Sequence, residues 1–357
     1  MTAFTIDELP IPATLDGAGG ADFVEMTRAR NEIEAGIVGS YDLAYEPAEL
    51  LPNWQNPYNP QRLLLPRVDG RIVGRGIYQA PIEEGSRDAW LSVEVLPEFR
   101  RRGIGSALYD RLVAMAREQG RTVLQCYIVH RDAAGERIPS PTGFGSVPRD
   151  TEQTRFLTKR GYALGQVERV SRLALPVEPG ILQGMADAAA QKAGADYRTV
   201  TWQGRTPEHW LPGMAELHRR MSTDTPAAEM EFAEEAWDVE RVRVAEELRE
   251  QSGRVSLLAA VEHLPSGALV AFSELFVPAE TERAVEQHDT LVLREHRGRR
   301  LGMLVKATNL LHLERTLPGH PSVTTFNAEE NRYMLDVNEA VGFAPIAYAG
   351  GWKQTIS

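Results

Sequence analysis

The sequence predicts an α/β protein made of two successive domains of one fold, each with a mixed sheet covered by helices. Three observations support this prediction. The chain has 357 residues, which suits two domains better than one. In the first half, the apolar strand Ala89–Val95 leads through a glycine-containing turn into an amphipathic helix. The same pattern returns in the second half at a constant offset of 197 residues, which indicates an internal repeat.

Charge and composition exclude several classes of function. The net charge of −11 argues against nucleic acid as a partner and weakly favours a cationic substrate. No apolar run reaches the roughly 18 residues of a transmembrane helix, so no membrane partner is expected. The first basic residue is Arg28, so a signal peptide's charged start is missing and a cytoplasmic location is expected. The single cysteine, Cys126, lies in the apolar run Val123–Val129, which predicts a buried thiol and not a nucleophile.

Caps and turn residues predict the elements that precede the central turn. A helix is expected at Phe23–Ala35, with Asp22 as its N-cap and Gly36 as its end. The segment Pro47–Pro60 holds four prolines, so we expect an irregular stretch that forms either a wall of a substrate site or a surface loop. The pair Asp69-Gly70 between two apolar runs predicts a hairpin.

The central turn has the features of a phosphate-binding loop. Gly103 and Gly105 have no Cβ, so the backbone can adopt a positive φ and let an anion approach its N–H groups. The predicted helix Ser106–Gln119 directs its unpaired N–H groups and its dipole toward the same point. Arg100–Arg102 add positive charge. The ligand that fits this turn is a pyrophosphate.

The remainder of the first half completes one domain. The predicted elements are a buried strand Thr122–Val129, a loop Arg131–Arg149, a helix Asp150–Arg160 and a strand Val167–Leu175. Two prolines and a glycine at Pro176–Gly180 then interrupt the pattern. We therefore expect one domain at residues 1–176, a connecting helix at 177–196 and a second domain at 197–357.

The second half repeats the first with one change in the turn. The predicted elements are strands at Tyr197–Trp202, Val255–Glu262, Ala268–Phe276, Thr290–Leu293 and Val323–Phe326, and helices up to Leu317 and at Asn331–Ala340. In the repeat Glu295 falls on Glu98 and Gly302 on Gly105, but Arg300 takes the position of Gly103. A bulky residue at a positive φ costs about 1 to 3 kcal/mol, so we expect a weakened or reshaped phosphate site there. The acidic run Glu229–Glu235 is expected to be a solvated helix face.

The motif Arg-x-x-Gly-x-Gly, preceded by V-x-V-x-P-E-aromatic-R, closely resembles the acyl-CoA signature of the GCN5-related N-acetyltransferases, the GNAT superfamily. The resemblance implies two tandem acyl-CoA N-acyltransferase domains of the type found in actinobacteria, with acetyl-CoA as cofactor. In that family the turn holds the CoA pyrophosphate, and the strand before it binds the pantetheine arm. The implied cofactor-binding residues are Val93, Glu94, Val95, Arg100, Arg101, Arg102, Gly103, Ile104, Gly105 and Ser106.

Catalysis by this family also requires a base for the amine and an acid for the departing thiolate. Glu94 is the first candidate for the base, because it lies on the strand before the turn and burial would raise its pKa; a surface glutamate is the equal alternative. Glu274 is a second candidate. The tyrosine that serves as acid in the family is replaced by Leu157 in the first half and by Asn338 in the second.

Two histidines are assigned no catalytic role. His130 ends the buried strand and His296 lies in the second turn, and both are interpreted as ordinary polar residues. No group of His, Cys, Asp or Glu has the spacing of a metal site.

The resemblance thus implies acetyl transfer from CoA to a primary amine of a small molecule, with CoA bound mainly in the first domain. Two alternatives remain open. The protein could use another acyl-CoA or another acceptor, or it could be a non-catalytic sensor or scaffold that binds CoA. The sequence indicates neither the acceptor nor the oligomeric state.

Overall fold

The computed structural model describes residues 3–131 and 133–356, which form two compact units. The first unit comprises Met1–Glu168, Ala227–Ala233 and Ala347–Ser357, and the second comprises Arg169–Pro226 and Glu234–Ile346. This division differs from the expected boundaries at residues 176 and 197. The chain first passes from one unit to the other between Glu168 and Arg169, inside the strand Ala163–Ala174. Two segments of the second half of the chain belong to the first unit.

The N-terminal part of the first unit consists of β1 (Thr5–Leu9), α1 (Gly20–Val38), α2 (Pro47–Trp54), β2 (Gln61–Val68), β3 (Arg71–Ile72), β4 (Gly74–Gln79) and β5 (Asp88–Val95). The predicted hairpin is confirmed, with Asp69 and Gly70 both at positive φ. Helix α1 continues past Gly36 and ends at Gly39, which adopts the left-handed conformation that closes a helix.

The segment Pro47–Pro60 is not irregular throughout, because its first eight residues form α2. Glu46 and Glu49 form a reciprocal capping box, in which the Glu46 backbone N–H donates to the Glu49 carboxylate at 2.8 Å. Leu51 and Trp54 are buried against α1, and Pro47 occupies the first turn, where proline is tolerated. The expectation failed because proline near a helix start is compatible with the helix.

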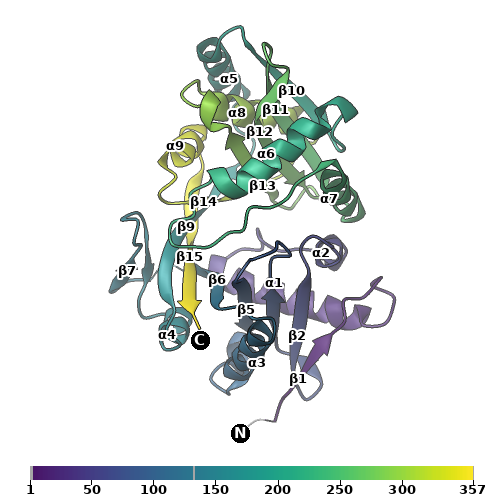
Figure 1. The fold of residues 1–357 in the computed structure, drawn as a ribbon, viewed down its shortest axis with the longest axis vertical. Coiled ribbons are helices and arrows are strands. Elements are labelled where there is room, and N and C mark those ends of the chain that lie inside the picture. Colours follow the sequence, from purple (N-terminus) through teal and green to yellow (C-terminus); the bar gives the residue numbers. More distant parts are fainter. Residues whose placement is uncertain (1–2, 132, 357) are drawn as a thin grey trace. The chain divides into compact units, whose positions relative to one another are not determined.

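The rest of the first unit consists of α3 (Ile104–Glu118), β6 (Val123–His130), β7 (Arg137–Pro139), β8 (Ser146–Pro148), α4 (Glu152–Thr158), the first half of β9 (Ala163–Ala174) and the last residues of β15 (Ala344–Thr355). The strand order is β1-β2-β4-β5-β6-β15. Helices α1 and α3 cover opposite faces of this sheet, since α1 packs on Leu63 and Leu65 and α3 packs on Leu64 (Figure 1).

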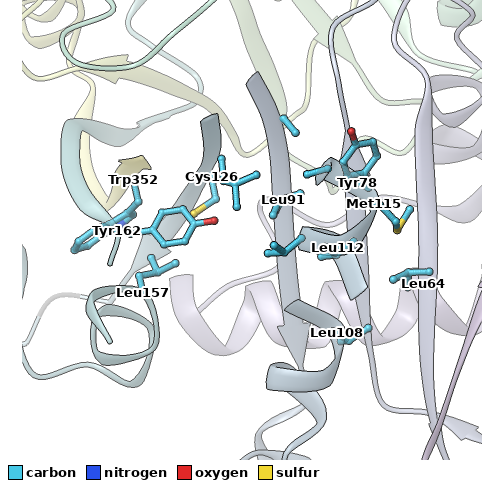
Figure 2. Packing of buried hydrophobic residues seen from close by; sticks show 14 of the residues in the cluster. Leu64, Tyr78, Leu91, Leu108, Leu112, Met115, Cys126, Leu157, Tyr162 and Trp352 are labelled. Carbon is cyan, nitrogen blue, oxygen red and sulfur yellow. The ribbon is translucent and has the colours of Figure 1, made fainter. Parts of the chain in front are cut away.

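The final strand of the chain, which the sequence pattern did not reveal, completes the core of the first unit. β15 pairs antiparallel with β6 over eight residues, from Tyr348 opposite His130 to Thr355 opposite Val123. The Trp352 side chain lies beside Tyr162 and Cys126 in the same core as Leu91 and Leu108 (Figure 2). A strand from the end of the chain is therefore part of the domain that begins at its start.

The second unit repeats the same kind of mixed sheet. Its elements are α5 (Pro179–Ala193), β10 (Tyr197–Gln203), α6 (Leu211–Asp224), α7 (Val239–Gln251), β11 (Val255–His263), β12 (Ala268–Val277), β13 (Val285–Val292), α8 (Leu301–Thr316), β14 (Ser322–Ala328) and α9 (Arg332–Val341). The strand order is β14-β13-β12-β11-β10, with β13 and β14 parallel and the other described pairs antiparallel.

In the described part of the chain, no helix combines the length and the apolar character needed to cross a bilayer.

The Trp352 side chain is 1% exposed, so Trp352→Ala leaves a large cavity in the core of the first unit. We expect a loss of about 3 to 5 kcal/mol in the free energy of unfolding, measured by urea denaturation. Tyr333→Ala is the control, because Tyr333 is 89% exposed and its removal should change stability by about 0.5 kcal/mol or less. Equal effects of the two substitutions would contradict the assignment of β15 to this core.

Cys126 is a buried strand thiol, as the sequence predicts, and burial raises its pKa to about 12. At pH 8 the folded protein should therefore react with an aromatic disulfide reagent at a small fraction of the rate seen in denaturant, because the thiolate is the reactive form. The release of one chromophore per chain measures this rate. Rapid labelling of the folded protein would show that the strand around Cys126 opens readily.

Candidate functional site

A cleft opens in the first unit where two parallel strands separate. β5 and β6 pair only at Asp88 with Val123, Ala89 with Leu124 and Trp90 with Gln125. Beyond Trp90 the two strands carry no further ladder, and the ranges 92–95 and 127–129 line a cleft of about 850 Å³ instead. Backbone groups on the inner edge of β5 are thus available to a ligand and not to a neighbouring strand.

One end of the cleft is the predicted phosphate turn. Arg101 and Gly103 both adopt the left-handed conformation, with φ of 62° and 89°, and α3 begins directly after Gly103. A Cβ at Gly103 would meet no heavy atom within 4 Å, so the space above this backbone is open. The N-terminal amides of α3 therefore face a ligand that lies in the cleft.

The three consecutive arginines have different roles. Arg100 donates from Nε to the Val95 carbonyl at 2.9 Å and pairs with Glu152 at 3.3 Å, so it braces the turn. Arg102 donates to the Glu98 carbonyl at 2.7 Å, and its side chain is outside the cleft lining, as is that of the buried Ile104. The turn residues that line the cleft are Arg100, Arg101, Gly103, Gly105 and Ser106.

Three further cations line the same end of the cleft, and the sequence analysis did not assign them to the site. They are Arg155, Lys159 and Arg160, at the end of α4 and just beyond it. Arg160 donates to the Ser106 hydroxyl at 2.8 Å and stacks over the Phe156 ring at 3.6 Å. No local motif marks these residues, because only the packing of α4 beside α3 brings them to the turn.

Carboxyl groups also line the cleft. Glu94 on β5 is one of them, and both of its carboxylate oxygens bind Arg75, at 2.9 Å and 2.7 Å. The side chains of Arg75 and Glu94 are 9% and 19% exposed, so this is a largely buried bidentate pair. Glu94 is thus a largely buried, ion-paired carboxyl, and nothing in the sequence pointed to Arg75 as its partner.

A second carboxyl, Glu34 on α1, also lines the cleft and was not among the predicted residues. Burial raises the pKa of Glu34, and the negative charge of Glu94 raises it further, whereas Arg30 and Arg75 oppose the shift. A carboxyl in this state binds and releases a proton more readily near neutral pH than an exposed glutamate does. The sequence carries no signal for it beyond its place on a helix face.

A group of stacked aromatic rings adjoins the cleft near the paired ends of β5 and β6. Tyr127 lines the cleft and stacks on Trp90 at 5.6 Å, and Phe232 also stacks on Trp90, at 5.3 Å. Phe232 belongs to the acidic run that was expected to be a solvated helix face. This run forms no helix, and the Glu231 backbone exchanges two hydrogen bonds of 2.7 Å with the Gln125 side chain.

Neither predicted position for the family's acid holds a hydroxyl. Leu157 is buried in the core, and the Asn338 side-chain oxygen Oδ1 accepts a hydrogen bond from Lys306 Nζ at 2.6 Å. The cleft is lined by the hydroxyls of Ser92 and Ser106 and by two phenol hydroxyls. Tyr109 donates to Gln354 at 3.0 Å, and Tyr127 donates to Gln166. Burial raises the pKa of Tyr109, so its hydroxyl stays protonated at neutral pH.

The remaining sequence candidates lie elsewhere. His130 is buried at the end of β6, outside the cleft lining, and burial lowers its pKa to about 4. His296 accepts or donates a 2.9 Å hydrogen bond with the Tyr197 hydroxyl in the second unit. Glu274 is also in the second unit, on β12.

Comparison with known proteins identifies part of the chain and the fold of the whole. Residues 30–135 match the model of the acetyltransferase (GNAT) family. A tandem GNAT protein from the clavulanic acid biosynthesis pathway, solved without AcCoA, is 24% identical with a TM-score of 0.70, and the match covers 98% of each chain. A GCN5-related N-acetyltransferase from Sphaerobacter thermophilus is 14% identical with a TM-score of 0.62, covering 99% of this chain and 95% of that one. The comparison with curated proteins gives no significant match.

Proposed function

We propose that the first unit transfers an acetyl group from acetyl-CoA to a primary amine of a small molecule. The proposal is supported by the match of residues 30–135 to the acetyltransferase (GNAT) family model and by the similarity of the whole fold to that of a tandem GNAT protein. One observation carries the proposal. A single cleft is lined both by the cationic turn and by the carboxyl groups of Glu34 and Glu94. An acyl donor with a diphosphate and an acceptor with an ammonium group would therefore find groups of opposite charge in the same site.

The cofactor would lie along the separated edge of β5. The amides that follow Gly103 would bind the pyrophosphate, and Arg101, Lys159 and Arg160 would neutralise its charge. The backbone between Ser92 and Val95 would hold the pantetheine arm and polarise the acyl carbonyl. The turn is already in the required conformation, so binding involves little loss of backbone entropy.

Two carboxyl groups could supply the base, and their environments suggest different tasks. Glu94 remains the candidate from the sequence, but Arg75 binds both of its carboxylate oxygens beside the cleft. Glu34 has the raised pKa that suits proton transfer. We propose that Glu94 attracts and orients the ammonium group and that Glu34, directly or through a water molecule, removes its proton.

The thiolate needs a proton from a group other than the family's tyrosine. Tyr109 and Tyr127 are the phenol hydroxyls of the cleft that could provide it. If neither does, a CoA-binding sensor becomes the better proposal, and the buried Leu157 at the family's acid position is the observation that favours this alternative. Thiol release from acetyl-CoA in the presence of a panel of amines separates the enzyme from the sensor.

Gly103→Glu should reduce acetyl-CoA binding at least tenfold, because it strains a backbone at φ 89° and places a negative charge where the pyrophosphate would lie. Isothermal titration calorimetry measures the affinity. Gly120→Glu is a matched control at the far end of α3, with φ of 69° and equally open space. An unchanged affinity for Gly103→Glu, or an equal loss for Gly120→Glu, would refute the role of this turn.

The rate should rise with pH as the Glu34 carboxyl loses its proton, with an apparent pKa above the usual 4.5 because burial raises it. Glu34→Gln should remove this ascending limb and lower kcat by about 100-fold to 10,000-fold. Glu94→Gln should shift the limb to lower pH, since the like charge beside Glu34 is gone, and should raise KM. The pH profiles of kcat and kcat/KM are measured with an amine that passes the thiol-release screen. If Glu94→Gln removes the ascending limb and Glu34→Gln only shifts it, the base is Glu94.

A further inference from the structure

The cleft of the first unit is lined from both faces of the sheet. Val93 and Val95 of β5 pack against the core that contains α3. Because side chains alternate along a strand, Ser92 and Glu94 lie on the opposite face, which α1 covers. The residues of β5 and α1 that line the cleft on this face are Ser92, Glu94, Ile33, Glu34 and Ile37. The carboxyl groups of the cleft therefore belong to its α1 side.

An aromatic row of Trp90, Tyr127 and Phe232 reaches the cleft on the same side. Trp90 and Tyr127 are nearly parallel, with an angle of 8° between the ring planes and 5.6 Å between the centroids. Phe232 stacks on Trp90 at 5.3 Å. Trp90 alternates with Leu91 and Tyr127 with Cys126, and both of these neighbours are buried in the core beside α3. The row thus lies on the α1 side, and Tyr127 is its member in the cleft lining.

Phe232 is brought to the row by a segment from the second half of the chain. Residues 227–233 belong to the first unit. The Glu231 carboxylate binds Arg87 at 3.0 Å, and the Met230 side chain is 5% exposed, so the segment is held on both sides of its backbone. The Phe232 side chain is nevertheless 48% exposed. An exposed aromatic ring on a fixed segment beside a cleft is typical of a binding surface.

The polar groups of the aromatic row are bonded within the protein. Trp90 Nε1 donates to the Asp88 carboxylate at 2.9 Å, and Asp88 is 3% exposed. The Tyr127 hydroxyl donates to Gln166, which is 1% exposed. These bonds fix the two rings and occupy their donors, so the row presents carbon surface and π-electrons to a ligand. A hydroxylated acceptor such as an amino sugar would lose hydrogen bonds to water here and regain few.

The rest of the α1 side favours a ligand with one charge. Among the described residues that line it, the polar side chains besides Tyr127 are Ser92, Glu34 and Glu94. Ile33 and Ile37 supply apolar surface from α1. An amine with a single ammonium group and an apolar remainder matches this lining. A polyamine would place its second charge against carbon atoms, which costs the hydration of that charge.

The register of β5 and β6 gives the spacing between the aromatic row and the carboxyl groups. Trp90 lies opposite Gln125, so Tyr127 is level with Ser92 along the strand direction. Glu94 is the second residue beyond Ser92, at about 7 Å along the strand, so a chain of about two to three carbon atoms between ring and nitrogen spans the gap.

We propose that the acceptor of the first unit is an arylalkylamine, a primary amine joined by a short chain to an aromatic ring. The ring packs on Tyr127, which Trp90 and Phe232 support. The ammonium group lies beside Glu94. This inference rests on the acetyl transfer proposed for the first unit and narrows the class of its acceptor. It also gives the segment 227–233 a role at the site of the other half of the chain.

Isothermal titration calorimetry of the full-length protein with CoA added tests the acceptor class without turnover. Phenethylamine carries both the ring and the charge, ethylamine lacks the ring, and phenethyl alcohol lacks the charge. We expect phenethylamine to bind about tenfold or more tightly than either, because the buried ring and the paired ammonium group each add affinity. Glucosamine should bind no better than ethylamine. No measurable binding of phenethylamine, or equal affinity for ethylamine, overturns the proposal.

Matched substitutions show whether the aromatic row carries the preference. Tyr127→Phe keeps the ring and should keep the preference, whereas Tyr127→Leu should lower the affinity for phenethylamine about threefold to tenfold and leave that for ethylamine unchanged. Phe232→Ala should act in the same direction, and it provides the comparison if Tyr127→Leu does not fold. Phe144→Ala is the control, because Phe144 is 45% exposed in the first unit and outside the cleft lining. A preference that survives both Tyr127→Leu and Phe232→Ala overturns the proposal.

Thiol release from acetyl-CoA with the same amines separates this inference from the proposed function. If phenethylamine binds selectively and releases no thiol, the preference for an arylalkylamine stands and acetyl transfer by the first unit is refuted. If ethylamine supports thiol release with the same kcat/KM as phenethylamine, acetyl transfer stands and the arylalkylamine is refuted as the acceptor class.

Discussion

The separation of β5 from β6 after Trp90 is the feature on which the candidate site depends. Two parallel strands that remained paired would use their backbone groups on each other and leave no room for a ligand. Here the ladder stops after three residue pairs, and β6 takes a long antiparallel partner, β15, on its other side. The pairing of β6 with β15 holds the far wall of the cleft in place, so the opening is built into the sheet.

Charge is distributed along this cleft in a way that suits a two-substrate reaction. The α3 amides, Lys159 and Arg160 supply positive charge to the cleft, and the carboxyl groups of Glu34 and Glu94 line it as well. The Arg75–Glu94 pair is largely buried and bidentate, so it fixes the position of the Glu94 carboxyl. The negative charge of Glu94 adds to the effect of burial in raising the pKa of Glu34.

The two units show how a duplicated turn tolerates different residues. Both turns have two left-handed positions. Arg101 and Gly103 occupy them in the first turn, and Gly298 and Arg300 in the second, so each turn has one glycine and one arginine, in opposite order. The strain of a non-glycine residue there is of the order of 1 kcal/mol or more, so each turn carries a similar cost. The Gly-to-Arg difference therefore says little about which unit binds a cofactor, and the side chains around each turn matter more.

The sequence by itself determined the elements whose cause is local. The turn at Gly103, the hairpin at Asp69-Gly70, the buried strand around Cys126 and the repeat all follow from backbone sterics, helix-end amides and hydrophobic periodicity, which act over a few residues. The helix at Pro47 was missed although its cause is also local, because proline was interpreted only as a helix breaker.

Only the tertiary structure decided which distant residues share a site. Glu34, Arg160 and the aromatic row of Trp90, Tyr127 and Phe232 have no local signature, since they depend on helices and strands meeting through space. The same holds for β15 and for the non-helical run around Glu231, which join the first unit from the second half of the chain. Their place is fixed by the core and the hydrogen bonds of the first unit, and a pattern read along the chain does not contain that information.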